Sequence, residues 1–135
     1  PFQFQQLEKP GIHTILNSFD VMGGAHTFTV IWTTSKFRDA NPKTYKAVLA
    51  ALQEATEILN KDKRAAAQMW IEQTKSNLTV DWLHKVVTGP QVLYTLTPNS
   101  TLKYSDFMHK VGSIKKKPAT WKDLFFPEIH HVPGS

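Results

Sequence analysis

Two kinds of hydrophobic spacing divide this chain near residue 35. Before that point β-branched and aromatic residues predominate, as in the run HTFTVIWT over residues 26–33, where Phe28, Val30 and Trp32 would share one face of a strand. Residues 12–16 (IHTIL) are also rich in β-branched residues, and Gly23-Gly24 lies between the two runs. A pattern of this kind is typical of strands, so it predicts two short strands and a glycine turn. Two strands alone make a poor sheet, and this segment is therefore expected to pair elsewhere or to be the remnant of something larger.

From Ser35 onward the spacing becomes helical. Asn41 and Pro42 form a typical helix start, with Asn as the N-cap and Pro at the first helical position. The next apolar positions follow a helical repeat as far as about Asn60: Tyr45, Val48, Leu49, Leu52, Thr56 and Leu59. The sequence predicts a long helix with this stripe facing inward.

Capping residues predict further helices downstream. Their N-caps are expected at Asp62, at Thr79, and at Asn99 or Ser100, with Gly112 ending the last of them. The helix after Asp62 is expected to bury Ala66, Met69 and Trp70. Residues 120–123 (TWKD) resemble a capping box before a last turn.

The composition adds limits to this picture. The 135 residues are 41% hydrophobic and 20% charged, which suits one compact soluble domain. The chain has no cysteine, which excludes disulfides, thiolate metal sites and cysteine nucleophiles. The net charge of +5 comes from scattered residues, and the one run, Lys115–Lys117, is interpreted as a solvated loop before Pro118. No nucleic-acid partner is expected, because neither Arg clusters nor stacking aromatics accompany that run.

No motif in the sequence predicts catalysis or metal binding. The six histidines include no H-E-x-x-H pair, and Gly23-Gly24 belongs to no phosphate-binding glycine motif. G-x-S-x-G is absent as well. Glu54 and Glu57 lie opposite the apolar stripe of the long helix, which suits solvent. We therefore expect no enzyme, no catalytic residues, no metal site and no cofactor.

Several stretches, taken in order, resemble the solute-binding proteins of nitrate, sulfonate and taurine ABC importers. That group includes proteins that bind thiamine-pyrimidine precursors. The stretches are residues 11–16 (GIHTIL), 20–24 (DVMGG), 28–37 (FTVIWTTSKF), 41–45 (NPKTY) with the helix after it, 103–108 (KYSDFM) and 117–126 (KPATWKDLFF). The combination of strand, Ser-Lys-Phe turn and Asn-Pro helix is the most specific part of the resemblance.

The resemblance implies an α/β chain: the C-terminal fragment of a two-lobed type II periplasmic-binding-protein fold, mostly helical after two N-terminal strands. Residues 1–35 would be a remnant of the second lobe with the strand that crosses between lobes. Residues 36–127 would be a helical part that packs on the first lobe, and residues 128–135 a flexible tail. Family members are longer, so this chain is expected to lack the N-terminal lobe and to bind little by itself.

The implied function is capture of a small polar or anionic organic solute between two lobes, for delivery to an ABC permease and ATPase. The protein is then expected in the periplasm, or exported and associated with the membrane. Position along the crossing strand suggests ligand-binding residues Gly23, Gly24, His26, Thr27 and Phe28. A homo-oligomer through the exposed strands is also expected, because open strand edges tend to pair.

Two alternatives stay open. The first is an enzyme of the same fold that makes a pyrimidine; relatives of that kind need a histidine and a lysine from an N-terminal segment that these residues do not include. The second is a helical interaction protein unrelated to transport, which the helix-rich part after Ser35 favours and the predicted crossing strand and glycine turn oppose.

Overall fold

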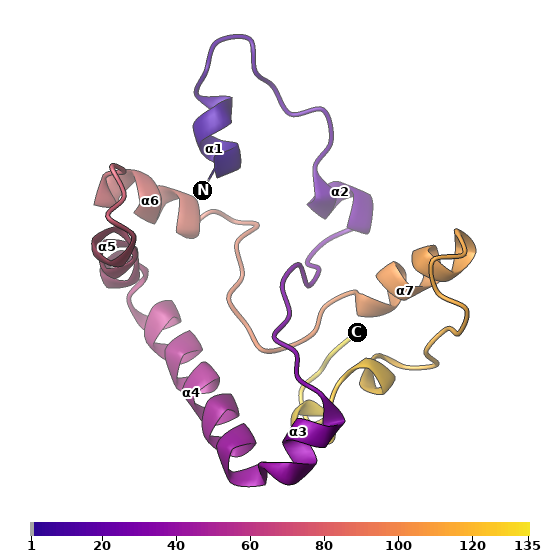
Figure 1. Cartoon of the computed structure of the whole chain (residues 1–135). Helices are drawn as coiled ribbons and strands as arrows, with labels where there is room; N and C mark the ends of the chain where they lie inside the picture. Colours follow the sequence, from indigo (N-terminus) through magenta and orange to yellow (C-terminus); the bar gives the residue numbers. More distant parts are fainter. Residues whose placement is uncertain (1) are drawn as a thin grey trace. The chain divides into compact units, whose positions relative to one another are not determined.

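The computed structural model describes residues 2–135, and every regular element within them is helical (Figure 1). The α-helices are α1 Phe2–Leu7, α2 Ser18–Met22, α3 Ser35–Ala40, α4 Pro42–Lys61, α5 Lys63–Thr74, α6 Val80–Val87 and α7 Thr101–Lys110. Two 3₁₀ helices follow, η1 Trp121–Leu124 and η2 Pro127–Ile129. The chain forms two compact units: unit 1 comprises the described part of Pro1–Ile15 together with Trp32–Tyr94, and unit 2 comprises Leu16–Ile31 together with Thr95–Ser135.

The predicted α/β class, and with it the fragment of a two-lobed type II periplasmic-binding-protein fold, is wrong for the residues described. Residues 12–16 and 26–33 form no strand, and the helix α2 lies between them. The physical reason is that β-propensity stabilises a strand only when a neighbouring strand supplies backbone partners. Neither segment finds such a partner within residues 2–135, so both stay irregular.

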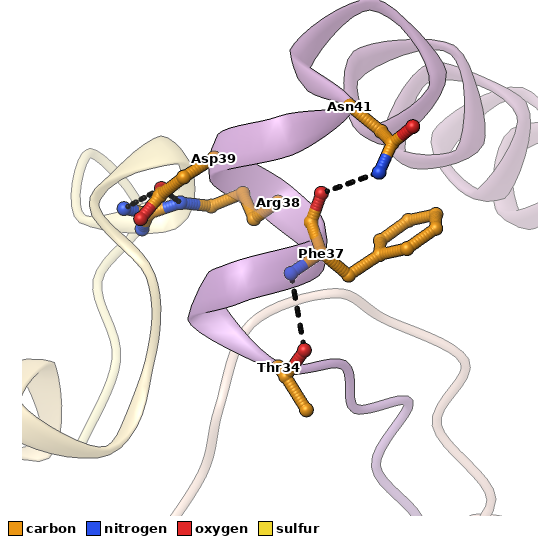
Figure 2. A network of polar contacts seen from close by, with 5 residues as sticks. All are labelled: Thr34, Phe37, Arg38, Asp39 and Asn41. Atoms are coloured by element: carbon orange, nitrogen blue, oxygen red, sulfur yellow. Dashed lines mark hydrogen bonds and ion pairs between the residues drawn. The ribbon is translucent and has the colours of Figure 1, made fainter.

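The junction of α3 and α4 confirms the predicted helix start at Pro42 (Figure 2). The Thr34 side chain caps α3, its Oγ1 accepting from the Phe37 N–H at 3.1 Å. Asn41 occupies the N-cap position of α4, but its side chain donates backward to the Phe37 carbonyl at 3.0 Å. The Asn41 side chain therefore satisfies a carbonyl at the end of α3. Pro42 is the first residue of α4, where its fixed φ already suits a helix.

The helix α4 has the predicted length but is only partly covered. Tyr45, Leu49, Leu52 and Leu59 are half-buried, while Val48 of the same stripe is 49% exposed. Glu54 and Glu57 are exposed, as expected. The stripe is therefore the inner face, yet no residue of α4 is fully buried.

The best-packed part of unit 1 is the contact between α5 and α6. Ala67 on α5 and Leu83 on α6 are only 3% and 4% exposed. The predicted inner face of α5 is wrong in part, because Met69 is 59% exposed and Trp70 is also exposed. A small residue such as Ala67 lets two helices approach closely. The face of α5 that carries Ala67 therefore packs against α6, and the face that carries Met69 and Trp70 does not.

The N-caps of α5 and α6 are the residues that the sequence predicts. Asp62 Oδ1 accepts from the Ala65 N–H at 2.9 Å, and Thr79 Oγ1 accepts from the Trp82 N–H at 3.2 Å. Arg64 pairs with Asp81 at 2.6 Å, but both side chains are largely exposed, and such pairs contribute little stability. Unit 1 therefore depends on packing and caps more than on ion pairs.

Trp121 is the buried aromatic of unit 2. Trp121 is the first residue of η1, directly after the N-cap Thr120. The predicted capping box is present, and in it the Thr120 N–H donates to Asp123 Oδ2 at 2.9 Å. The rings of Phe125 and His130 lie 6.0 and 5.7 Å from its ring. The last residues, expected as a flexible tail, lie against this core: a Cβ added to Gly134 would come within 2.7 Å of the Trp121 ring.

The chain leaves an unusually large surface uncovered. Its accessible surface is 10429 Å², whereas a folded monomer of this mass exposes about 7,000 Å² and two separate units of these sizes would together expose about 8,600 Å². Much of the excess is apolar: Ile15 and Leu16, for example, are both largely exposed. Among the described helices, none has the length and apolar content to cross a bilayer.

Candidate ligand-binding site

The predicted ligand-binding residues begin where α2 ends. Asn17 caps the start of this helix, accepting from the Phe19 N–H at 2.8 Å. At the other end Gly23 has φ 71 and Gly24 has φ 134. The Gly24 N–H donates to the Phe19 carbonyl at 2.8 Å and the Gly23 N–H to that of Asp20 at 3.1 Å, which is a Schellman motif. The glycine pair therefore ends a helix, where a turn between strands was predicted.

Four hydrogen bonds join the loop after α2 to the start of α7, within unit 2. The Thr27 N–H donates to the Asn99 carbonyl at 2.9 Å, and the Asn99 N–H donates to Thr27 Oγ1 at 2.8 Å. Ser100 Oγ donates to the Ala25 carbonyl at 2.9 Å. The Lys103 ammonium donates to the Met22 carbonyl. Residues 22–27 and 99–104 thus form one polar cluster, called the loop–α7 cluster below.

His26 lies inside this cluster, where its ring contacts a backbone carbonyl. Its Nδ1 is 3.0 Å from the Gly24 carbonyl, and because a carbonyl only accepts, Nδ1 carries the proton. In the neutral form of such a ring, Nε2 is an acceptor. The Tyr104 ring lies 6.1 Å from the His26 ring, tilted by 53°. His26 and Tyr104 therefore lie side by side in the cluster.

Lys103 is the cation of the cluster. A Cβ added to Gly23 would lie 3.3 Å from its Nζ, so the ammonium is held against the glycine turn. Within the described residues no carboxylate reaches ion-pair distance of it; Asp106, one turn further along α7, pairs with Lys117 at 2.9 Å. An ammonium has three donors, so Lys103 can bind an anionic group while keeping the Met22 carbonyl.

The helix start itself is already occupied. The Ser135 carbonyl accepts from the Thr101 N–H and from Thr101 Oγ1, both at 2.7 Å. Ser135 Oγ accepts from the Ser100 N–H at 2.9 Å. These first N–H groups of α7 therefore bond to Ser135, and the polar side chains of the cluster that remain available are those of His26, Lys103 and Tyr104.

Four of the five predicted residues, Gly23, Gly24, His26 and Thr27, belong to the loop–α7 cluster, whereas Phe28 is 91% exposed. Sequence reasoning did not select Asn99, Ser100, Lys103 or Tyr104 as site residues. Lys103 and Tyr104 do stand in one of the stretches that carry the family resemblance, and this was the signal that could have identified them.

Two further observations concern other chemistry. In the described residues no three His, Asp or Glu side chains gather closely enough to hold a metal ion. Burial raises the pKa of the Tyr94 phenol, which lies in unit 1 and outside the cluster. Comparisons of the chain with protein-family models, curated proteins and solved structures give no match.

Proposed function

We propose that this chain is part of the solute-binding component of a bacterial ABC importer. Its ligand would be a small polar or anionic organic solute, and its partners a permease and an ATPase. The component would act in the periplasm, or exported and held at the membrane. The observation that carries the proposal is the ordered series of family-like stretches over residues 11–126. Function is proposed here from those stretches; the architecture of residues 2–135 is helical.

The loop–α7 cluster supports the proposal by its chemistry. It brings most of the predicted ligand-binding residues together with a cation, Lys103, and an acceptor nitrogen on His26. Charge-assisted hydrogen bonds to an ammonium are about twice as strong as neutral ones. A carboxylate or sulfonate group next to a polar body is the type of ligand that this combination suits.

The uncovered apolar surface also supports a role within a larger assembly. Binding a small solute needs convergent polar groups and exclusion of water. Apart from the buried Thr101, the side chains of the loop–α7 cluster are half-buried or exposed, so this chain by itself excludes water poorly. We therefore expect strong binding only where further protein closes over the cluster.

Calorimetry tests the proposal directly. This chain and a longer protein that contains it are titrated with nitrate, sulfonates, carboxylates and pyrimidines. We expect micromolar binding of one solute by the longer protein and far weaker binding by this chain. For an anionic solute, Lys103→Met in the longer protein should weaken binding at least about tenfold, because a hydrogen bond to a charged group contributes about 1.5–3 kcal/mol.

The matched control is Lys116→Met, which removes an exposed lysine of the 115–117 run. Equal affinity in the short and long proteins would refute the need for further protein. Unchanged binding by Lys103→Met would remove the cluster from the site. Turnover of any solute would favour the pyrimidine-synthesis enzyme instead.

A helical interaction protein is the second candidate, and the structure gives a specific reason to keep it. The two features that opposed it, a crossing strand and a glycine turn between strands, are absent from residues 2–135. Uncovered apolar residues, such as Phe107 on α7 and Val111 directly after it, suit protein contacts. Genes for a permease and an ATPase beside the gene for this chain would favour transport, and their absence would favour this candidate.

A further inference from the structure

The segment over residues 28–33 (FTVIWT) leads from unit 2 into unit 1. Its large apolar side chains are exposed to solvent. Phe28, Val30, Ile31 and Trp32 are 91%, 55%, 72% and 81% exposed. Among the described residues, no backbone N–H or carbonyl of the segment has a hydrogen-bond partner in the chain. The segment therefore presents both apolar side chains and unpaired backbone groups.

Its composition favours pairing with an identical segment. It holds no charge, no proline and no glycine, and all six residues have high β-propensity. Segments of this kind pair strand to strand when they are exposed. Two identical copies can approach without charge repulsion, since the segment carries none. We propose that residues 28–33 are a homodimer surface, on which two copies of the chain pair as antiparallel strands.

The alternation of side chains and the pairing of the aromatic residues together favour one register. If the two-fold axis passes through Val30, Phe28 lies opposite Trp32 of the second copy, and Val30 lies opposite its own equivalent. Phe28, Val30 and Trp32 of both copies then share one face, because side chains alternate along a strand. A register shifted by one residue would mix threonines into that face. The centred register also forms two cross-strand aromatic pairs, which stabilise such ribbons.

The area involved suits a specific contact. A buried Phe or Trp removes about 150–250 Å² from water, so the four aromatic side chains of a dimer contribute roughly 600–1,000 Å². Val30 and the backbone, on the same face, bring the total close to the ~1,000 Å² that a specific interface needs. The segment is therefore large enough, in two copies, to hold a dimer.

Cysteine cross-linking tests the register, because the chain has no cysteine of its own. Residues directly opposite in an antiparallel pair have Cα atoms about 4.5–5.5 Å apart, within the range a disulfide spans. We expect Val30→Cys to form a disulfide-linked dimer rapidly under mild oxidation. Val48→Cys, at a similarly exposed valine on α4, is the control and should cross-link much more slowly.

Light scattering tests the dimer itself. The full chain should be dimeric, and Val30→Lys should make it monomeric, because two lysines would face each other across the pair. Val48→Lys should leave the dimer intact. A monomeric chain at high concentration, or equal cross-linking at Val30→Cys and Val48→Cys, would overturn the proposal. A dimer lost in Phe107→Ser but kept in Val30→Lys would also overturn it and place the contact on α7. None of these results depends on solute binding, so this inference and the proposed function can fail separately.

Discussion

At the scale of single residues, the hydrogen bonds that cap the helices join residues close in sequence. Asn17, Thr34, Asp62 and Thr79 each accept a hydrogen bond from a backbone N–H two or three residues ahead. Such bonds satisfy the free N–H groups at helix starts and need no distant partner. The loop–α7 cluster is different, because Thr27 and Asn99 are 72 residues apart.

Tyr94 gives a pH-dependent prediction at this scale. Burial raises the pKa of its phenol above the ordinary value of about 10. As the pH rises past that value, the unfolded chain loses this proton before the folded chain does, so the free energy of unfolding falls. Below the ordinary value the group has no such effect. Denaturant unfolding of wild type and Tyr94→Phe from pH 9 upward should show the alkaline fall reduced in the variant.

Tyr104→Phe serves as the control, since Tyr104 lies outside unit 1. If Tyr94→Phe lost stability with rising pH just as steeply as the wild type, another group would be responsible.

At the scale of elements, caps and breakers defined helices well, whereas their inner faces were harder to assign. The helix α4 begins at Pro42 and α6 begins after Thr79, as the sequence predicts. On α5 the covered residue is Ala67, and Met69 is exposed. The identity of the neighbouring helix decides which face is covered, and the sequence of α5 does not contain that information.

The contact between α5 and α6 predicts a difference between two core-like residues. Leu83→Ala should lower the free energy of unfolding by about 2–5 kcal/mol, because it removes buried methyl groups and leaves a cavity. Met69→Ala, at an exposed position on α5, should change it by less than about 0.5 kcal/mol. Denaturant unfolding followed by circular dichroism measures both. Similar midpoints would mean that α5 and α6 do not pack as described.

At the scale of the whole molecule, little apolar surface is removed from water. Ala67, Leu83 and Trp121 are the buried hydrophobic residues described. Because stability depends mainly on apolar burial, the 135 residues taken alone should be less stable than a compact domain of the same length. Association with a second copy, or with further protein, would cover part of this surface.

Calorimetry at low protein concentration provides the corresponding prediction. A compact protein of this length unfolds with about 0.7 kcal/mol per residue near 60 °C, or roughly 95 kcal/mol in all. We expect a clearly smaller enthalpy and a broad transition for this chain. A sharp transition with the full enthalpy would show that far more of the chain is packed than its accessible surface indicates.

The candidate site was predictable in part. Gly23 and Gly24 were selected by their position next to the expected crossing strand, and in the structure both have positive φ at the end of α2. His26 and Thr27 were selected by position along an expected strand, and they lie in the loop–α7 cluster without that strand. Their partners come from α7, more than 70 residues away, and spacing along one segment cannot indicate such a contact. Phe28 was selected on the same grounds, but its side chain is almost fully exposed to solvent and lies outside the cluster.

The sequence by itself determined the starts of α4, α5, α6 and η1, because a helix start depends on a few neighbouring residues. It also determined the β-prone character of residues 26–33. Whether that segment forms a strand was decided only in the tertiary structure, because a strand requires a backbone partner from another segment. The same holds for the buried face of α5 and for the joining of the glycine loop to α7. In each case the deciding contact is made with residues distant in sequence.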